Sequence, residues 1–329
     1  MTHLAEPNPV LPPLDAAAEV ERIGASMIAT LSRTIHRRGV VLGVSGGVDS
    51  AVCVSLAARA LGAERVFALL MPERDSTEDG TARAIDLCER LGVPYKIEDI
   101  TDALAAAGAY RHRDDAIRRI FPDYDDGWRQ KVVLASDPLG EARISYFDLV
   151  VEDPDGNRQR TRMPVDVYRQ VIAATNMKQR IRKLTEYYHA ERLNFAVLGT
   201  PNRLEYELGF FVRGGDGLAD LKPIAHLYKS QVYALAAYLE VPEAIRRQPP
   251  STDTYSLEQT QEEFYYSLPW RDMDCILWAE HEGLSAAEAG RPLGLTADQV
   301  TKVWRESAGK RRAAARALAD AVTVEPIGL

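Results

Sequence analysis

The chain has 329 residues, of which 46% are hydrophobic and 27% are charged, and its formal net charge at pH 7 is −8. This composition is typical of a globular protein with a full core, and it excludes bulk disorder and collagen-like sequence. The acidic balance argues against a protein that grips nucleic acid over a broad surface, so any phosphate chemistry is expected to be local.

Cysteine usage and the N-terminal sequence bear on the cell compartment. The three cysteines, Cys53, Cys88 and Cys275, are scattered and form no C-x-x-C pair, so we expect no disulfide framework, zinc ribbon or iron–sulfur cluster. The N-terminal stretch lacks the basic start and apolar run of a signal peptide, and no segment approaches the roughly 18–20 apolar residues of a membrane span. We therefore expect a cytoplasmic protein with neither a membrane nor a nucleic acid as partner.

The first half of the chain alternates between apolar runs and amphipathic helices. Residues 1–15 carry four prolines and are expected to form a flexible tail before one folded domain, residues 16–329. Apolar residues at helical spacing then predict a helix from Glu19 to Arg37. Short apolar runs predict buried strands, and helical patterns lie between them: strands Val40–Val44, Val66–Met71 and Tyr95–Ile100, and helices Ser50–Leu61 and Thr77–Leu91.

This alternation is typical of βαβ crossovers in a parallel sheet. A charged helix from Met177 to Arg192 and a fourth apolar run, Asn194–Gly199, extend it. We predict an α/β fold with a doubly wound parallel sheet.

The alternation breaks between residues 101 and 175, where Asp and Arg are frequent. The runs Ile144–Val151 and Arg158–Met163 flank the turn sequence Asp153-Pro-Asp-Gly156, a pattern that predicts a β-hairpin. We expect this segment to be inserted into the parallel-sheet core.

Beyond residue 221 the chain is mostly helical, with a C-terminal helical region over about residues 272–329. Ser285-x-x-Glu288 and Thr296-x-x-Gln299 are capping boxes that each predict a helix start. Their arrangement superficially resembles a helix-turn-helix. Because residues 296–305 show no basic face, we favour a packed helical hairpin over DNA recognition.

The most informative segment is the stretch between the first strand and the next helix: Gly43, Val44, Ser45, Gly46, Gly47, Val48, Asp49 and Ser50. Small residues here let backbone N–H groups approach an anion, and the start of the helix adds its positive end. The stretch lacks the lysine of a Walker loop and does not fit G-x-G-x-x-G. It predicts a phosphate-binding loop, with a glycine-rich turn that binds nothing as the alternative.

The string S-G-G-x-D-S at residues 45–50 resembles the signature of the PP-loop ATP pyrophosphatases, whose fold is that of the adenine nucleotide alpha hydrolases. Enzymes of this superfamily transfer AMP to a substrate and release pyrophosphate into the loop. The tRNA-thiolating members need a cysteine that relays sulfur. Cys53 and Cys88 have the sequence surroundings of core residues, so thiolation is disfavoured.

Later motifs resemble the ammonia-dependent NAD synthetase family. They are Asn176-Met-Lys-Gln-Arg180-Ile-Arg182, Gly199-Thr200-Pro-Asn-Arg-Leu-Glu205, Gly209 to Asp220, Leu227-Tyr-Lys229 and Pro249-Pro-Ser251-Thr-Asp253. The resemblance implies that the nicotinate carboxylate of deamido-NAD attacks the α-phosphate of ATP, and that ammonia then displaces AMP to leave the amide of NAD. The physical need is plain, because a carboxylate is a poor electrophile until one oxygen belongs to a leaving group.

The resemblance also implies residue roles. Asp49 and Lys229 would be catalytic, with Lys229 on the phosphates, and Asp49 and Glu205 would hold Mg²⁺. Thr200 and Ser251 would place hydroxyls on ATP or its metal, beside the loop residues 43–50. Contacts to deamido-NAD would come from Arg180, Arg213, Asp220 and Lys310.

The same resemblance implies ATP as co-substrate and a homodimer. A glutaminase domain is not expected before Val40, so ammonia would be free or come from a separate glutaminase.

Several side chains also have ordinary explanations. Arg180 fits a solvated helix face, Glu205 and Lys229 could be surface charges, and Lys310 could lie at an exposed helix end. Two positions depart from the family pattern, because Arg213 replaces the usual Lys and Gly309 replaces the His that usually precedes Lys310.

The aromatic residues Tyr265, Tyr266 and Trp270 are expected in the core rather than on a ligand. Two competing functions stay open: amidation of another carboxylate by the same chemistry, and a non-catalytic nucleotide-binding protein.

Overall fold

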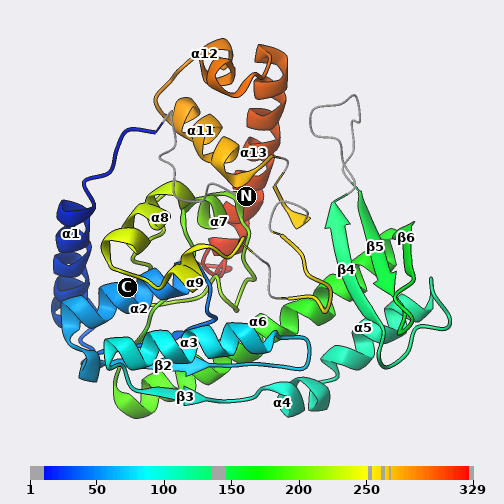
Figure 1. Ribbon diagram of the computed structural model, residues 1–329, viewed down its shortest axis with the longest axis horizontal. Helices are drawn as coiled ribbons and strands as arrows, with labels where there is room; N and C mark the ends of the chain where they lie inside the picture. Colours follow the sequence, from blue (N-terminus) through cyan, green and yellow to red (C-terminus); the bar gives the residue numbers. More distant parts are fainter. Residues whose placement is uncertain (1–10, 135–145, 251–253, 261–263, 267, 326–329) are drawn as a thin grey trace.

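The structure, a computed structural model, describes residues 11–134, 146–250, 254–260, 264–266 and 268–325 (Figure 1). Its centre is a four-stranded parallel sheet with the strand order β3-β2-β1-β7. The strands are β1 (Val40–Gly43), β2 (Val66–Leu70), β3 (Tyr95–Ile97) and β7 (Ala196–Val197). All four lie within the predicted runs, and the predicted α/β class is confirmed.

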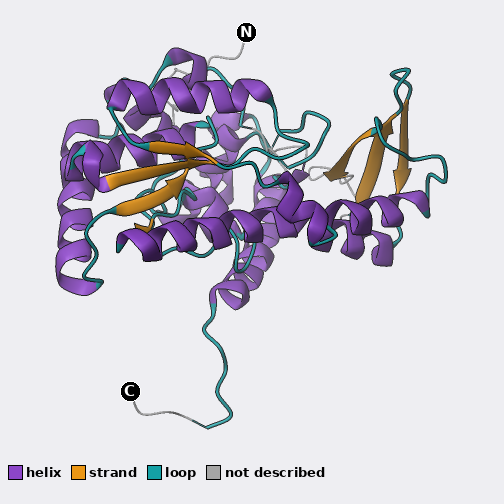
Figure 2. Cartoon of the chain, turned by 90° about the horizontal axis from the view of Figure 1, so that it is seen from below, coloured by secondary structure: helices purple, strands orange, loops and turns teal. Residues whose placement is uncertain are grey.

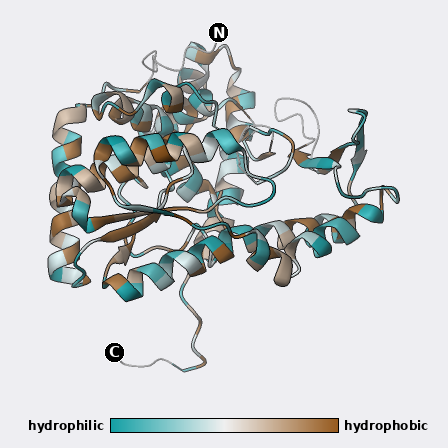
Figure 3. Cartoon of the chain, turned by 60° about the horizontal axis from the view of Figure 1, so that its bottom comes forward, coloured by the Kyte–Doolittle hydropathy of each residue, from teal (hydrophilic) through white to brown (hydrophobic). Residues whose placement is uncertain are grey.

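Side chains of β1 alternate between two cores. Val40 and Leu42 belong to the larger buried cluster, whereas Val41 points to the opposite face and joins a smaller one. All three have no exposed surface. A continuous apolar run is therefore explained by a strand covered on both faces, and Figure 3 shows the strands of this sheet in brown between the helices.

Helices cover both faces of the parallel sheet. The larger cluster is formed with α1 (Ala16–Ala29, continued by a π-helical turn, Thr30–Thr34), α2 (Val48–Leu61), α3 (Glu78–Leu91) and α8 (Lys229–Tyr238). The opposite face is covered by α4 (Thr101–Ala106), α5 (Ala109–Arg118) and α6 (Val165–Leu193). Leu11, which precedes α1, is buried in the larger cluster.

Helix α6 is longer than the sequence predicts. It has 29 residues, begins after Pro164 and ends at Asn194, whose φ of 56° is left-handed. The expected helix from Met177 is the second part of α6, so the predicted helix start was wrong. No proline or glycine interrupts residues 165–193, and a helix of this length spans about 43 Å at 1.5 Å per residue.

A second sheet stands on the N-terminal part of α6, away from the parallel sheet (Figure 2). It is antiparallel, with the order β4-β5-β6, and comprises β4 (Arg129–Leu134), β5 (Phe147–Glu152) and β6 (Arg158–Arg162). Strands β5 and β6 form a hairpin whose turn contains Gly156 with a φ of 86°. The first residues of the expected strand, 144 and 145, lie outside the described residues, and β4 was not predicted.

The C-terminal region contains further helices, named here in chain order: α7 (Arg203–Leu208), α9 (Glu243–Arg246), α11 (Trp270–His281), α12 (Ala286–Gly290) and α13 (Ala297–Leu318). Both predicted capping boxes are present, at Ser285 and Thr296. Helix α13 buries Val300 and Val303 in the larger cluster, and the Trp304 indole N–H donates to the carbonyl of Ile276 at 3.0 Å. The prediction of a packed helical hairpin is confirmed.

The surroundings of cysteines and of three aromatic residues were also predicted. Cys53 and Cys88 are buried, as expected of core residues, and Cys275 is buried as well. Tyr266 and Trp270 are buried in the larger cluster, and Tyr265 packs against it. Within the described part of the chain, no helix combines the length and the apolar character that a membrane span requires.

The strand order has a switch point beside β1. From β1 the chain proceeds through α2 to β2 on one side, whereas β7 pairs with β1 on the other side. Ligands of open α/β sheets bind outside the carboxyl ends of the strands at such a switch point. The loop after β1 and the segment after β7 both emerge there.

Candidate nucleotide-binding site

The loop after β1 has the geometry of an anion site. Gly47 is the N-cap of α2, and no side chain caps this helix among the described residues. Ser50 Oγ accepts from the backbone N–H of Ser45 at 3.2 Å and donates to the carbonyl of Gly47 at 3.0 Å. Gly46 has a φ of 81°, and a Cβ there would lie 2.3 Å from the carbonyl oxygen of Gly80. The loop is thus fixed in shape while the positive end of α2 stays open.

Two other helix starts meet the start of α2. Asn202 caps α7 and donates from Nδ2 to Asp49 Oδ1 at 3.0 Å. Lys229, the first residue of α8, forms an ion pair with the other oxygen of Asp49. Residues 49, 202 and 229, far apart in sequence, are therefore brought together at one point.

The side chains that cap these helices differ. Asn202 and Glu205 cap α7 reciprocally, with backbone-to-side-chain distances of 3.1 and 3.2 Å. The first turn of α8 donates instead to Asp274 of α11. Only α2 of the three offers a helix start without a side-chain cap in the described residues, so a phosphate is best accommodated there.

Lys229 is fixed as a buried cation. Its side chain is 2% exposed. Burial by itself would lower the pKa of Lys229, but the carboxylates of Asp49 and Glu205 raise it above its usual range. The ammonium group therefore keeps its proton and can serve as a point charge beside phosphate oxygens.

The carboxylates of Asp49 and Glu205 also affect two other buried side chains, Cys53 and Tyr266. Burial raises the pKa of the Cys53 thiol well above its usual value, and the charges of Asp49 and Glu205 add to the effect. Such a thiol is a poor nucleophile, which agrees with the case against sulfur transfer. Tyr266 is 3% exposed, and burial and the charge of Glu205 raise its pKa. Its hydroxyl has no hydrogen-bond partner among the described residues.

The remaining predicted residues lie around this cluster in different ways. Thr200 follows β7, two residues before Asn202, and is half-buried. Ser251 lies outside the described residues. Arg180 Nε donates to the carbonyl of Arg213 at 3.2 Å, which places the Arg180 side chain of α6 against the backbone of the loop after α7.

Asp220 and Lys310 are engaged within the protein. Asp220 Oδ2 accepts from the backbone N–H of Val197 at 2.7 Å, at the end of β7. Lys310 of α13 donates to the carbonyl of Tyr265 at 2.7 Å and pairs with Glu306 at 2.8 Å. Arg213 reaches the carbonyl of Ala319, just past α13, at 3.4 Å.

Two functional residues were missed from the sequence. Asn202 sits between Asp49 and Glu205, and the spacing Asn202-x-x-Glu205 is a capping-box signal that could have revealed it. Asp274 has no exposed surface, and burial raises its pKa to about 6. No local signal marks Asp274, since its partners are 44 and 45 residues away.

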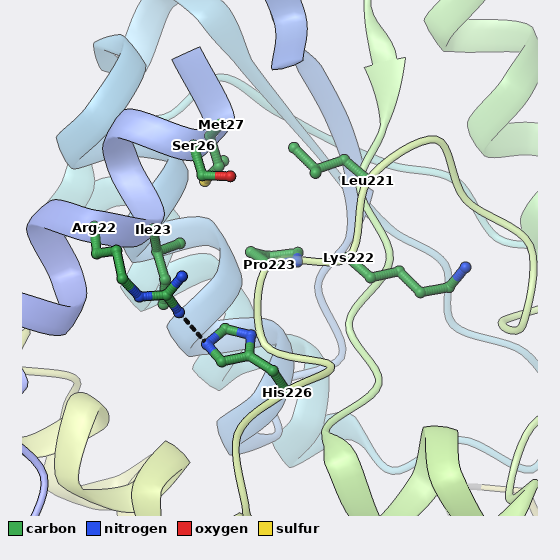
Figure 4. A pocket seen from close by; sticks show the side chains of 8 residues that line it. All are labelled: Arg22, Ile23, Ser26, Met27, Leu221, Lys222, Pro223 and His226. Atoms are coloured by element: carbon green, nitrogen blue, oxygen red, sulfur yellow. Dashed lines mark hydrogen bonds between the residues drawn. The ribbon is translucent and has the colours of Figure 1, made fainter. Parts of the chain in front are cut away.

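Two surface hollows lie outside this cluster. One, of about 100 Å³, lies between α1 and the segment after β7, where Arg22 contacts His226 at 2.7 Å (Figure 4). The other, of about 580 Å³, is lined mainly by α7 and α13. Neither includes a predicted site residue, so the assignment of the nucleotide site rests on the loop and the charges.

Comparisons with known proteins agree with this geometry. The sequence model described as NAD synthase matches residues 20–120 and 155–314. The NH(3)-dependent NAD(+) synthetase of Rhizobium rhizogenes is 54% identical over 95% of this chain and 94% of its own, and the one of Rhizobium meliloti is 56% identical over 91% and 89%. This chain belongs to the NAD synthase family.

A solved structure described as NMN synthetase from Francisella tularensis matches 94% of this chain and 99% of its own, with a TM-score of 0.63 and 21% identity, which shows a shared fold. The NAD synthase model leaves residues 121–154 unmatched, and these contain β4 and β5. The second sheet therefore lies in large part outside the residues that this family model matches.

Proposed function

We propose that the chain is an ATP-dependent amide ligase that converts deamido-NAD and ammonia to NAD, AMP and pyrophosphate. The observation that carries this proposal is the identity of 54–56% to ammonia-dependent NAD synthetases over nearly the whole chain. The ion pair of Asp49 with the buried Lys229, beside an uncapped helix start, supports it, because such a reaction needs a cation near phosphate oxygens.

The first step joins the nicotinate carboxylate to AMP. A carboxylate oxygen attacks the α-phosphorus of ATP, the bond to the β-phosphate oxygen breaks, and pyrophosphate leaves with the electron pair. Backbone N–H groups of the loop and the start of α2 would receive the pyrophosphate, and Lys229 would balance charge that develops on it. In the second step ammonia attacks the acyl carbon, AMP leaves, and the added nitrogen loses a proton.

The residues present suit Mg²⁺. Asp49 and Glu205 offer carboxylate oxygens near one another, and the Tyr266 hydroxyl is a buried polar atom without a partner in the described residues. No group of three metal-ligating side chains is found in that part of the chain. This agrees with a cation held by one or two carboxylates and by substrate phosphates. Bound there, Mg²⁺ would neutralise charge on the triphosphate.

On the substrate side, we propose that Arg180 and Arg213 bind the phosphates of deamido-NAD, with Asp220 and Lys310 completing the site. The contact between Arg180 and the backbone of Arg213 supports a joint role. Thr200 and Ser251 would donate hydroxyl hydrogen bonds to ATP.

We further propose a cytoplasmic homodimer that uses free ammonia or ammonia from a separate glutaminase. Leu184 and Tyr188 of α6 are 66% and 60% exposed, and an apolar pair four residues apart on one helix suits a contact between copies. Light scattering of wild type and of Leu184→Glu tests this, because the dimer is expected to dissociate in the variant and a monomeric wild type would refute it.

The function is tested with ATP, Mg²⁺, ammonium and deamido-NAD. We expect NAD, AMP and pyrophosphate in equal amounts. AMP released only when another acid replaces deamido-NAD would favour the alternative substrate. ATP binding without AMP release from any acid would favour a non-catalytic role.

A further inference from the structure

Asp274 takes part in none of the roles assigned above, yet it contacts the residue that carries the buried cation. It is the fifth residue of α11, and its carboxylate has no exposed surface. Its Oδ1 accepts from the backbone N–H of Lys229 at 3.2 Å, and its Oδ2 accepts from the N–H of Ser230 at 2.7 Å and from the Ser230 hydroxyl. All three of these bonds end on the first turn of α8.

This arrangement differs from the caps of other helices in the chain. Helices α7, α12 and α13 are capped by their own N-cap residues, which are Asn202, Ser285 and Thr296. At the start of α8 the N-cap position is Tyr228, whose backbone N–H donates to Oε1 of Gln231 in the same helix at 3.0 Å, whereas the N–H groups of Lys229 and Ser230 donate to Asp274. A local serine or asparagine would satisfy the same donors without burying a carboxylate far from its own helix. Because this acceptor lies on α11, the same bonds that cap α8 also join the two helices.

The bonds to Asp274 fix α8 relative to α11. Trp270 of α11 stacks on Tyr233 of α8 with ring centroids 5.2 Å apart, so the two helices touch at two points one turn apart. From the first position of α8 the Lys229 side chain reaches the carboxylate of Asp49. A lysine side chain is flexible, so its own stem does not fix the ammonium. The position of the first turn of α8, from which the Lys229 side chain extends, sets how far the ammonium can reach.

We propose that Asp274 is a positioning residue for adenylation, which holds the first turn of α8 so that the ammonium of Lys229 stays at the phosphate loop. The proposal rests on the proposed function, because Lys229 acts on ATP only if the chain adenylates a substrate. It makes the C-terminal helical region part of the catalytic apparatus through α11.

The test compares Asp274→Asn with Thr296→Ala, which removes an ordinary N-cap from α13 in the same region. We expect Asp274→Asn to lower kcat by about 10- to 100-fold with a smaller change in KM for ATP, because the interaction matters most when charge develops on the leaving group. Thr296→Ala is expected to keep kcat within about 3-fold. Equal kcat values for the two variants, or a loss in KM alone, would overturn the proposal.

A double-mutant cycle separates positioning from general damage. In a Lys229→Met background, Asp274→Asn is expected to lower the remaining rate by less than about 3-fold, since the group it positions is gone. A loss as large as in the wild-type background would overturn the proposal. If Asp274→Asn does not fold, Ser230→Ala replaces it in both arms and is expected to lower kcat by about 3-fold.

Hydrogen exchange gives a readout that does not depend on the reaction. The amides of residues 229 and 230 are expected to exchange faster in Asp274→Asn than in wild type. In the control Thr296→Ala these two amides are expected to exchange at the wild-type rate. Unchanged exchange at these amides would overturn the proposal even in an active enzyme. A wild type that forms no NAD but shows the expected exchange would refute the proposed function alone.

Discussion

The buried lysines Lys178 and Lys229 lie in different surroundings. The comparison distinguishes a charged cluster that stabilises the fold from one that is proposed to bind a ligand. Lys178 of α6 donates to Glu73, Asp75 and the carbonyl of Thr254 at 2.8, 2.7 and 2.8 Å. Its three N–H donors thus have three acceptors. In the described residues Lys229 has one acceptor, Asp49, whose side chain is 19% exposed. We name the surroundings of Lys178 the closed cluster and those of Lys229 the open cluster.

The closed cluster joins two parts of the fold. Asp75 follows β2 and also accepts from Arg113 of α5 at 2.6 Å, while Glu73 accepts from the Tyr110 hydroxyl at 2.8 Å. It therefore links the parallel sheet to the helices beneath the second sheet. In the open cluster Lys229 has one acceptor among the described residues, and the neighbouring start of α2 has no side-chain cap there. A satisfied network holds chain segments together, whereas an unsatisfied one has room for a ligand.

The largest expected effect is on the open cluster. Asp49→Ala removes the partner of Lys229 and a proposed metal ligand, so pyrophosphate release is expected to fall by at least about 1000-fold. The thermal midpoint is also expected to fall below that of the control Asp86→Ala, which alters an exposed pair with Arg90, because the buried ammonium of Lys229 loses its acceptor. Wild-type turnover in Asp49→Ala would contradict the assignment.

Next comes the closed cluster. Lys178→Met removes the cation of Glu73 and one of the cations of Asp75, which keeps Arg113, and the free energy of unfolding is expected to fall by about 3–5 kcal/mol. Urea denaturation measures the loss, with Arg90→Met as an exposed control expected to change it by less than about 1 kcal/mol. A loss in Lys178→Met no larger than in the control would remove the distinction between the clusters.

The two clusters are also expected to respond to pH with opposite sign. Burial would raise the pKa of Asp75, but Lys178 and Arg113 lower it below the usual 3.8, so its stabilisation is present above about pH 4 and is lost as the pH falls through the folded pKa. Burial raises the pKa of Asp274 to about 6, so its contribution is greatest below about pH 4 and declines as the pH rises through 6.

Urea denaturation of wild type, Asp75→Asn and Asp274→Asn between pH 3 and 8 measures how the contributions of Asp75 and Asp274 to the free energy of unfolding change with pH. Relative to Asp274→Asn, wild type is expected to lose about 2 kcal/mol between pH 4 and 7. The advantage of wild type over Asp75→Asn is expected to shrink below pH 4. Parallel curves for all three proteins would contradict the charge states assigned to the clusters.

The smallest effect is expected in the second sheet. Arg160 pairs with Asp148 at 2.6 Å, but its side chain is 57% exposed. Arg160→Ala is expected to change the free energy of unfolding by less than about 1 kcal/mol and to leave NAD formation unaltered. A loss comparable to that of Lys178→Met would show that exposure does not rank these ion pairs.

Local patterns predicted the parallel sheet and the loop because each depends on neighbours in sequence. The run Val40–Val44 is apolar because β1 is covered on both faces, and Gly46 is required by its own φ. The predicted start of α6 at Met177 was wrong, although Pro164 and Asn194 mark the two ends of the helix in the sequence.

Features that depend on distant packing could not be predicted. Strand β4 has the mixed sequence Arg129-Gln-Lys-Val-Val-Leu134, and its buried face is defined only by pairing with β5. In the sequence Asp274 is one of several charged residues in a helix, and only the packing of α11 on α8 shows that it contacts the first turn of α8. The clustering of Asp49, Asn202 and Lys229 likewise required the fold, although each lies in a motif that the sequence displays.

Isotope transfer tests the adenylation chemistry at the open cluster most directly. Deamido-NAD labelled with ¹⁸O in the nicotinate carboxylate is converted with ATP and ammonium, and the products are weighed by mass spectrometry. Attack on the α-phosphorus moves one labelled oxygen into AMP for each NAD formed, and this is the predicted result. Unlabelled AMP, or label in inorganic phosphate with ADP as the product, would contradict it.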